Sequence, residues 1–387
     1  MRFVINGLGT GGAERSLAEL LPRLVAEGIE PSVVCLYRRD EGVQEDVRAA
    51  GFDVRFLSAG GRVGRVRELR GLLAEDRPDL VHTTIFEADL VGRLASASLR
   101  IPLVTSLVNT SYDDVRLLDP NVRRWRLATA RLVDGWTARR LTTWFHAITR
   151  TVAESAVQSL GIPGDRITVI PRGRDAERLG APSPERKERA RRALALEPRD
   201  QVLLSVARQE FQKGQGTLVS AMSRLPATAV LLIAGRDGNA TATLRAAASS
   251  LGDRVRFLGH RSDVPELLAA ADVFVFPSIY EGLGGAVIEA MALGLPVVAS
   301  DLPALHEVVE PGRSAVLVPA GNADRLAEAV GGLLRDRPEL GRLGRRGREL
   351  FLEKFTIEGV ARRMSEMFRS VADVGRRPGR EAGRGIG

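Results

Sequence analysis

The residue types most able to do chemistry gather in residues 277–300, PSIYEGLGGAVIEAMALGLPVVAS. Glu281 precedes Glu289 by eight residues, and three glycines lie between them. A helix that begins near Gly284 would leave its first amide groups unpaired and its positive dipole end open to an anion. Glycines let a phosphate approach the backbone closely, and carboxylates accept hydrogen bonds from hydroxyl groups such as those of a sugar or a ribose. The stretch therefore predicts a phosphate seat flanked by two hydroxyl-binding carboxylates, with two solvated surface carboxylates as the alternative.

A second candidate group is basic. Arg208 and Lys213 lie five residues apart in VARQEFQKG, a loop that ends at Gly214. Both side chains can point at one diphosphate, and each opposite-charge contact at about 4 Å is worth on the order of 4 kcal/mol at an effective dielectric near 20. Such a pair would stabilise a departing nucleotide diphosphate in a transition state. The alternative is that both are ordinary solvated surface charges.

A third group is glycine-rich. Residues 7–12 read Gly-Leu-Gly-Thr-Gly-Gly after an apolar run, which also fits the dinucleotide fingerprint G-x-G-x-x-G. A dinucleotide-binding domain would need an acidic residue at the end of the second strand, where this chain has Tyr37, Arg38 and Arg39. The arginines would suit NADP, so a redox enzyme stays an alternative to a loop that touches a donor phosphate or an acceptor.

The elements that must position these groups are short β-branched runs separated by stretches of helical periodicity. This pattern predicts an α/β fold with doubly wound parallel sheets covered on both faces. The strands are expected at 2–6, 31–37, 53–59, 79–84, 102–108, 145–149, 167–171, 201–207, 228–235, 254–259, 272–278, 296–300 and 315–319. The default ligand site of such an architecture is the cleft at the carboxyl ends of the two sheets.

The same pattern predicts the domain organisation. Residues 1–172 form a first Rossmann-like domain and residues 173–355 a second, with a charged linker at the start of the second. A stripe of apolar residues at helical spacing predicts a closing helix over 356–373. Residues 374–387 are expected to be a disordered tail.

The composition limits the class of protein. The 387 residues are 44% hydrophobic and 27% charged, as in folded globular chains of two or more domains. No run of about 18 apolar residues could span a membrane, and the N-terminus becomes Gly-rich too early for a secretory signal. The single Cys35 excludes an internal disulfide and by itself forms no metal cluster. We therefore expect a cytoplasmic protein.

The charge favours acidic partners. The formal net charge is +8, and Lys occurs only at positions 187, 213 and 354, so nearly all basic residues are Arg. Phosphate-bearing ligands, nucleic acid and anionic membranes all suit this balance. Because the arginines are dispersed over most helices and aromatic residues are few, a nucleic-acid binder is the least favoured of these alternatives.

Several segments together resemble glycosyltransferase family 4, the retaining group 1 enzymes with the GT-B fold of two Rossmann-like domains. They are GTGGAERSLAELL, ITVIPRGRD, VARQEFQKG, LIAGRDG, FLGHRSDV, ADVFVFPSIYEGLGGAVIEAMALGLPVVAS and HEVVEPGRSAVLVPAGN. The resemblance covers nearly the whole chain and is much closer in the second domain. It implies a metal-independent hexosyltransferase with a second domain for the nucleotide sugar and a first domain for the acceptor.

The resemblance also implies roles for the acidic and basic residues. Glu289 would hold the ribose hydroxyls, and Glu281 would reach hydroxyls of the donor sugar. Arg208 and Lys213 would bind the diphosphate. With Glu281, these two basic residues are the expected catalytic set, which acts by positioning and by neutralising charge.

Further residues would contact the donor. The amides around Gly284 and Gly285 would cap the distal phosphate, and the loop at Gly11 and Gly12 would face it from the other domain. Two more residues, His260 and Arg261, would lie near the base. For His260, a polar loop residue without direct contact is an equal alternative.

Two positions depart from the family pattern. Many members carry a His after the fifth strand of the first domain, where this chain has Val108, so Ser106 or Asn109 would have to contribute instead. Arg172 stands where the family usually has Asn. These departures favour, as an alternative, a nucleotide-sugar-binding protein without turnover.

Two histidines and two adjacent aspartates could in principle bind a metal ion, but their positions favour other roles. His82 and His146 are expected to be packed strand residues. Asp113 and Asp114 are adjacent, so one points away from the other, and no Asp-x-Asp pair is placed for a metal. We therefore expect no metal site and no cofactor beyond the donor itself.

The sequence thus predicts transfer of a sugar from a UDP-type or GDP-type donor to a hydroxyl acceptor. The acceptor would be a cell-envelope glycan, a lipid-linked sugar or a secondary metabolite. In the retaining route proposed for this family, the acceptor attacks on the face that the nucleotide leaves, and a phosphate oxygen takes its proton. A sugar-nucleotide epimerase on the same fold is the remaining enzymatic alternative.

Residues 116–150 carry eight Arg against two Asp, with all three Trp of the chain interleaved. A basic helix with aromatic residues could rest on an anionic membrane at the inner face. The apolar residues do not fall cleanly on one face, so we favour the alternative, in which the Trp side chains pack beneath a helical pair.

Overall fold

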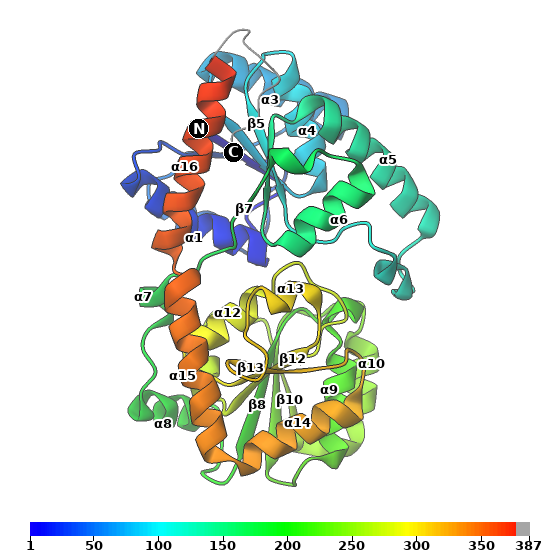
Figure 1. Ribbon diagram of the computed structural model, residues 1–387, viewed down its shortest axis with the longest axis vertical. Coiled ribbons are helices and arrows are strands. Elements are labelled where there is room, and N and C mark those ends of the chain that lie inside the picture. The colour runs from blue at the N-terminus through cyan, green and yellow to red at the C-terminus, as the bar shows by residue number, and fades with distance from the viewer. Residues whose placement is uncertain (377–387) are drawn as a thin grey trace. The chain divides into compact units, whose positions relative to one another are not determined.

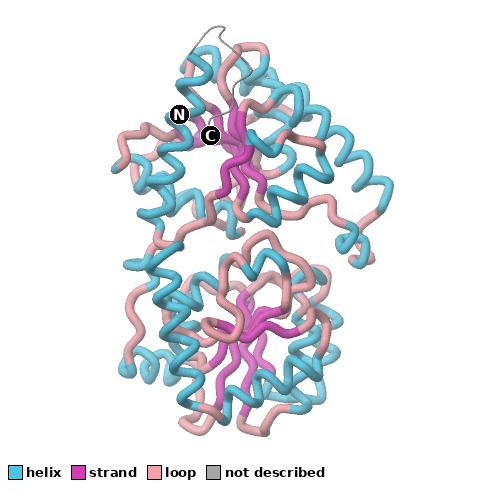
Figure 2. Tube along the Cα trace, viewed as in Figure 1, coloured by secondary structure: helices cyan, strands magenta, loops and turns pink. Residues whose placement is uncertain are grey.

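The computed structural model describes residues 1–376, and the chain divides into two compact units. Unit 1 comprises Met1–Tyr112, Arg124–Gly173 and the described chain from Ile357 onward, and unit 2 comprises Asp113–Arg123 and Arg174–Thr356. The sequence placed residues 113–123 in the first domain, whereas they group with unit 2. In both units strands occupy the centre and helices lie outside them (Figure 2).

Unit 1 is built on a parallel sheet in the order β3-β2-β1-β4-β5-β6-β7. The strands are β1 (Arg2–Ile5), β2 (Ser32–Cys35), β3 (Val54–Phe56), β4 (Val81–Thr84), β5 (Leu103–Leu107), β6 (Trp144–Ala147) and β7 (Ile167–Val169). Cys35 is a buried free thiol, as expected of a small strand residue. Burial raises the pKa of this thiol to about 12, so it is protonated and unreactive at neutral pH.

Helices cover both faces of the first sheet (Figure 1). They are α1 (Gly12–Ala26), α2 (Gln44–Ala49), α3 (Gly61–Asp76), α4 (Phe86–Ala97), α5 (Arg124–Leu141), α6 (Arg150–Leu160) and α16 (Ile357–Arg376). The predicted apolar stripe of the closing helix is confirmed, because Val360, Met364, Met367, Phe368 and Val371 are all buried. Helix α16 lies beside α1 and shares one core cluster with Phe3 and Leu21.

The end of α16 corrects one expectation. Residues 374–376, predicted to belong to a disordered tail, continue this helix. The rest of the predicted tail lies outside the described residues.

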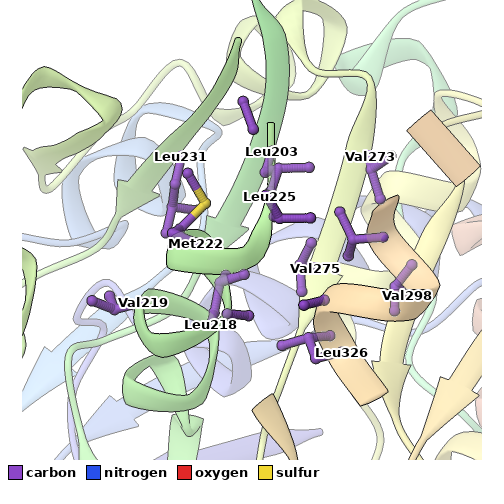
Figure 3. Close-up of a cluster of buried hydrophobic side chains, with 14 of the residues drawn as sticks. Leu203, Leu218, Val219, Met222, Leu225, Leu231, Val273, Val275, Val298 and Leu326 are labelled. Atoms are coloured by element: carbon purple, nitrogen blue, oxygen red, sulfur yellow. The ribbon is translucent and has the colours of Figure 1, made fainter. Parts of the chain in front are cut away.

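Unit 2 contains a parallel sheet in the order β10-β9-β8-β11-β12-β13. The strands are β8 (Gln201–Val206), β9 (Ala229–Ala234), β10 (Val255–Gly259), β11 (Val273–Phe276), β12 (Val297–Ser300) and β13 (Ala315–Val318). Leu203, Leu231, Val275 and Val298 from four of these strands pack against helical side chains such as Leu218 (Figure 3). Each of the runs predicted from the sequence therefore contains a strand, and the doubly wound α/β fold is confirmed.

The helices of unit 2 connect these strands and close the sheet. They are α7 (Ala176–Leu179), α8 (Pro184–Ala193), α9 (Gln215–Ala221), α10 (Thr241–Ala248), α11 (Val264–Ala270), α12 (Gly285–Ala292), α13 (Pro303–His306), α14 (Ala323–Arg335) and α15 (Arg337–Lys354). Ser183 caps α8 by accepting a hydrogen bond from the amide of Arg186, and Asn322 caps α14 through the amide of Arg325. Both are side chains favoured at a helix start.

The strand order creates a switch point in each sheet. In unit 2 the chain winds outward from β8 through β9 and β10, then returns to pair β11 directly with β8. In unit 1 the corresponding neighbours are β1 and β4. Loops diverge where the winding direction reverses, so the loops after β8 and β11 are the expected ligand site of unit 2.

Candidate active site

The loops after β8 and β11 are joined to each other by hydrogen bonds. The amide of Ile279 donates to the carbonyl of Gln212 at 2.8 Å, and the side-chain amide of Gln212 donates to the carbonyl of Tyr280 at 3.0 Å. Gly214 has φ +59°, and a Cβ atom there would lie 2.0 Å from the carbonyl oxygen of Pro277. Only glycine allows this approach. The switch point of unit 2 is therefore a closely fitted pair of loops.

Lys213 and Glu281 contact each other across these two loops. Lys213 Nζ forms an ion pair with Glu281 Oε1, and Ser278 Oγ donates to the same oxygen at 3.0 Å. The side chains are only 18% and 10% exposed. Partial burial strengthens a charge pair relative to one on the surface. Two residues predicted for adjacent parts of one donor thus lie together.

Arg208 has a different environment. Its side chain is 59% exposed, and Nη1 lies 2.5 Å from Glu210 Oε1. Arg208 and Lys213 therefore occupy separate ion pairs, each with its own carboxylate. Whether both groups bind one diphosphate stays a prediction.

The start of α12 follows the expected pattern. Gly284 is the N-cap residue with φ +87°, and its carbonyl accepts the first helical hydrogen bond, from the amide of Val287 at 2.9 Å. A glycine N-cap has no side chain to pair with the first amides, so these amides and the helix dipole are available to an anion. The predicted helix start near Gly284 is confirmed, and Gly285 is its first residue.

Glu289 lies inside α12, as predicted, but its partner was missed. The side chain of Glu289 is 9% exposed, and Arg174 Nε donates to Glu289 Oε1 at 2.7 Å. In the sequence, the segment around Arg174 is typical of a charged linker. No local pattern connects it to a carboxylate 115 residues later.

The candidate base-binding residues follow β10, an edge strand. His260 is exposed. Arg261 binds both carboxylate oxygens of Asp263, at 2.7 and 2.5 Å, and this pairing holds the pKa of Asp263 below its usual range. Contact of either residue with a nucleotide base stays a prediction.

The glycine-rich loop of unit 1 lies at the switch point of the first sheet. Gly11 is the N-cap of α1, and Gly12 is the first residue of that helix. Asn6 Oδ1 accepts a hydrogen bond from the amide of Ala88 at 2.9 Å, which ties the end of β1 to α4. Ile85 before α4 has φ +79°, which is strained for a β-branched residue, and such strain concentrates at functional sites. Figure 1 shows α1 and α4 in unit 1.

The histidines of the first sheet are packed strand residues, as expected. His146 Nδ1 lies 3.1 Å from Ser106 Oγ, and Nε2 lies 2.8 Å from the carbonyl oxygen of Ile170. Burial lowers the pKa of His146 to about 4 and holds the pKa of His82 well below its usual value. Both imidazoles are therefore neutral at physiological pH.

This packing corrects one of the substitutes proposed for the missing family histidine. Ser106 is buried and its hydroxyl is engaged with His146, so it does not replace the side chain absent at Val108. Asn109 is half-buried, and its Oδ1 accepts a hydrogen bond from the amide of Thr110 at 2.9 Å.

The tryptophans correct a second expectation. Trp125 and Trp136 on α5 are 64% and 54% exposed, so they do not pack beneath a helical pair. Trp144 alone behaves as a packed residue, and its Nε1 donates to Thr168 Oγ1 at 2.8 Å. Leu132, also on α5, is 70% exposed. The helix therefore presents aromatic, aliphatic and arginine side chains to solvent.

Residues 1–376 contain neither a metal-binding cluster nor a membrane-spanning helix. No cluster of three or more His, Cys, Asp or Glu side chains within this part of the chain could hold a metal ion. Within the same residues, every helix is too short or too polar to cross a membrane.

Comparisons with known proteins agree with this fold. The family model described as glycosyl transferases group 1 matches residues 186–350, and that of glycosyltransferase family 4 matches residues 10–178. A lipopolysaccharide core biosynthesis mannosyltransferase of Rhizobium meliloti is 30% identical over 255 residues, which are 63% of this chain and 71% of the relative. An alpha-maltose-1-phosphate synthase of Mycolicibacterium smegmatis is 30% identical over 315 residues, 76% and 79% of the two chains.

A solved structure shows the same architecture. The Anabaena protein HepE in complex with UDP-glucose has a TM-score of 0.83 and 23% identity, over 96% of this chain and 100% of that one. This likeness extends over both Rossmann-like units and confirms the GT-B fold.

Proposed function

This chain belongs to the family 4, group 1 glycosyltransferases with the GT-B fold, and from that premise we propose that it transfers a sugar from a nucleoside diphosphate sugar to a hydroxyl acceptor with retention of configuration. The observation that carries the proposal is the arrangement at the switch point of unit 2. There the Lys213–Glu281 pair follows β8 and β11, and Glu289 stands one turn inside a helix with an uncapped start.

The donor is proposed to bind unit 2 through its most strongly charged part. Lys213 and Arg208 would neutralise the diphosphate, while the amides of Gly284 and Gly285 at the start of α12 would donate hydrogen bonds to the distal phosphate. Glu289 would accept hydrogen bonds from the ribose and Glu281 from the donor sugar. Support for a UDP donor comes from HepE, whose complex contains UDP-glucose.

The proposed reaction needs no protein nucleophile. The bond between the anomeric carbon and the diphosphate breaks, and the acceptor oxygen bonds to that carbon on the same face. A phosphate oxygen of the leaving group receives the acceptor proton. The protein then acts by holding the reactants and by stabilising charge on the departing phosphate, a task for Lys213, Arg208 and the helix amides without a metal ion.

A panel of nucleotide sugars tests the proposed function. We expect either uridine diphosphate or guanosine diphosphate to raise the melting temperature most. A ligand at free concentration c that binds only the folded state stabilises it by RT ln(1 + c/Kd), so at equal concentration the tightest ligand gives the largest shift. The matching sugar nucleotide should release nucleotide in the presence of a hydroxyl acceptor, insensitive to EDTA, and NMR should show an anomeric configuration that is retained.

The other outcomes discriminate between the alternatives. Tight binding without transfer to any acceptor would support a binding protein, for which Val108 and Arg172 are the motivation. An altered free sugar nucleotide would indicate an epimerase. No stabilisation by any nucleoside diphosphate would contradict the proposal as a whole.

We also propose that α5 rests on the cytoplasmic face of an anionic membrane and so presents unit 1 to a lipid-linked or cell-envelope acceptor. The exposed Trp125, Leu132 and Trp136 lie along a helix whose arginines include Arg126 and Arg131. Tryptophan favours the headgroup region of a bilayer, and each nearby Arg adds about 1 kcal/mol of attraction to an anionic surface.

Co-sedimentation with phosphatidylglycerol vesicles checks this second proposal. We expect salt-sensitive binding that weakens at least about tenfold when Trp125 and Trp136 are both replaced by serine, because two interfacial anchors are lost. Leu352→Ser is the matched control, since Leu352 is 51% exposed on α15 of unit 2. Binding that is absent, insensitive to salt or unchanged in the Trp variant would contradict membrane docking by α5.

A further inference from the structure

Arg174 is a charged side chain inside unit 2. It is 2% exposed, although it lies in the segment that leads into α7. The backbone amide of Arg174 donates to the carbonyl of Phe355 at 2.8 Å, and Arg174 forms an isolated parallel β-bridge with Thr356. These contacts fix the backbone at this point. The side chain extends to α12, where Nε donates to Glu289 Oε1 at 2.7 Å.

The first residue of α12 leaves room for this guanidinium. A Cβ atom on Gly285 would lie 2.4 Å from Arg174 Nη2. The absence of a side chain at Gly285 therefore has a second cause besides access for a phosphate. The guanidinium lies against the first turn of the same helix that carries the candidate ribose-binding carboxylate.

This location is costly for a cation. Burial removes hydration from the guanidinium, and the positive end of the helix dipole disfavours a positive charge at the first turn. A buried ion pair is weak evidence for a contribution to stability, because an apolar pair of similar volume is often at least as stable. Stability alone therefore does not account for a cation at this place.

We propose that Arg174 is a positioning residue that orients Glu289 for the ribose of the donor. By binding Oε1, it fixes the carboxylate in one rotamer and directs Oε2 to the ribose hydroxyls. The carboxylate then loses less side-chain entropy when the donor binds, which is the general advantage of a preorganised site. This inference rests on the proposed function, in particular on the ribose contact of Glu289.

Arg174→Met tests the positioning role by calorimetry with UDP or GDP, whichever stabilises the wild type more, and with its 2′-deoxy and 3′-deoxy counterparts. We expect the wild type to prefer the ribonucleotide by about tenfold or more, since the deoxy forms lose hydrogen bonds to a charged acceptor. In Arg174→Met the preference should fall to threefold or less, with little change in affinity for the deoxy nucleotides. Arg174→Lys should give an intermediate preference.

A second buried pair supplies the matched control. In unit 1, Arg93 is 1% exposed and its Nη1 lies 2.6 Å from Asp134 Oδ1. Arg93→Met removes a guanidinium of similar burial that belongs to unit 1 and is paired with Asp134 instead of Glu289. It should change the unfolding midpoint without changing the preference for the ribonucleotide.

The outcomes separate this inference from the function on which it rests. A wild-type preference that Glu289→Ala abolishes and that both Arg174 variants retain would overturn the positioning role alone. Equal losses of affinity for the ribo and deoxy nucleotides in Arg174→Met would also overturn it, because they would indicate a phosphate contact instead. If the wild type shows no preference, the ribose contact of Glu289 itself fails. If Arg174→Met does not fold, Arg174→Lys decides by the same ratio.

Discussion

Replacing Glu289 with alanine is expected to weaken binding of the preferred nucleoside diphosphate by about 10²-fold. The variant loses the hydrogen bonds that two ribose hydroxyls would donate to the carboxylate, each worth about 1.5–3 kcal/mol, and water compensates for part of this loss. The change should also destabilise unit 2. It leaves the buried Arg174 without its carboxylate, and breaking a buried pair from one side costs about 3–5 kcal/mol. Calorimetry measures the first effect and urea unfolding the second.

Two further variants separate binding from stability. Glu289→Gln keeps an oxygen for Arg174 and should retain more stability than alanine while it still loses affinity. Glu188→Ala is the control, because Glu188 forms an exposed i,i+4 pair with Arg192 in the same unit and its loss should change neither quantity. A folded Glu289→Ala protein that binds nucleotide within twofold of the wild type would contradict the assigned role.

Replacing Lys213 with alanine is expected to lower the rate constant kcat/KM for the donor by about 10²–10³-fold, the range seen when one preorganised group that stabilises developing charge is removed. The ammonium lies at the loop pair and is 18% exposed, so its charge acts in partly desolvated surroundings. The loss should be largest in kcat, because charge on the leaving diphosphate grows toward the transition state. Steady-state assay of released nucleotide gives both constants.

The chain offers simple controls for Lys213 because it has only three lysines. Lys354 is exposed at the end of α15, so Lys354→Ala should leave kcat/KM unchanged. Lys213→Arg keeps the charge and should be intermediate. Mass spectrometry after brief amine acylation should show that nucleoside diphosphate protects Lys213 and not Lys354. Equal protection of both, or full activity of Lys213→Ala, would be incompatible with a diphosphate contact.

Much of the fold could be predicted because its signals are local. Val273 to Phe276 and Val297 to Ser300 are continuous buried strands, and such runs identify parallel sheets. Gly284 marks the start of α12 for an equally local reason, since its positive φ suits glycine. The strand order then brings β8 and β11 together, which explains why Lys213 and Glu281 meet.

The remaining features depend on contacts between distant residues. Arg174 looks like one more charge in an Arg-rich linker until the fold brings it to Glu289. The sequence of β5 does not show which side chain Ser106 contacts. The pairing of β5 with β6 places Ser106 opposite His146, and this brings the hydroxyl to the imidazole. Trp125 and Trp136 are exposed because no other element among residues 1–376 packs over their side chains on α5. The sequence of the helix alone does not indicate this.

The proposed function requires unit 2 to hold a nucleoside diphosphate at the start of α12. The most direct measurement is a crystal structure with the nucleotide that stabilises the protein most. We expect the ribose hydroxyls to lie within hydrogen-bond distance of Glu289, and the diphosphate to lie beside Lys213 and the amides of Gly284 and Gly285. A nucleotide that lies elsewhere, with the Lys213–Glu281 and Arg174–Glu289 pairs both untouched, would contradict it.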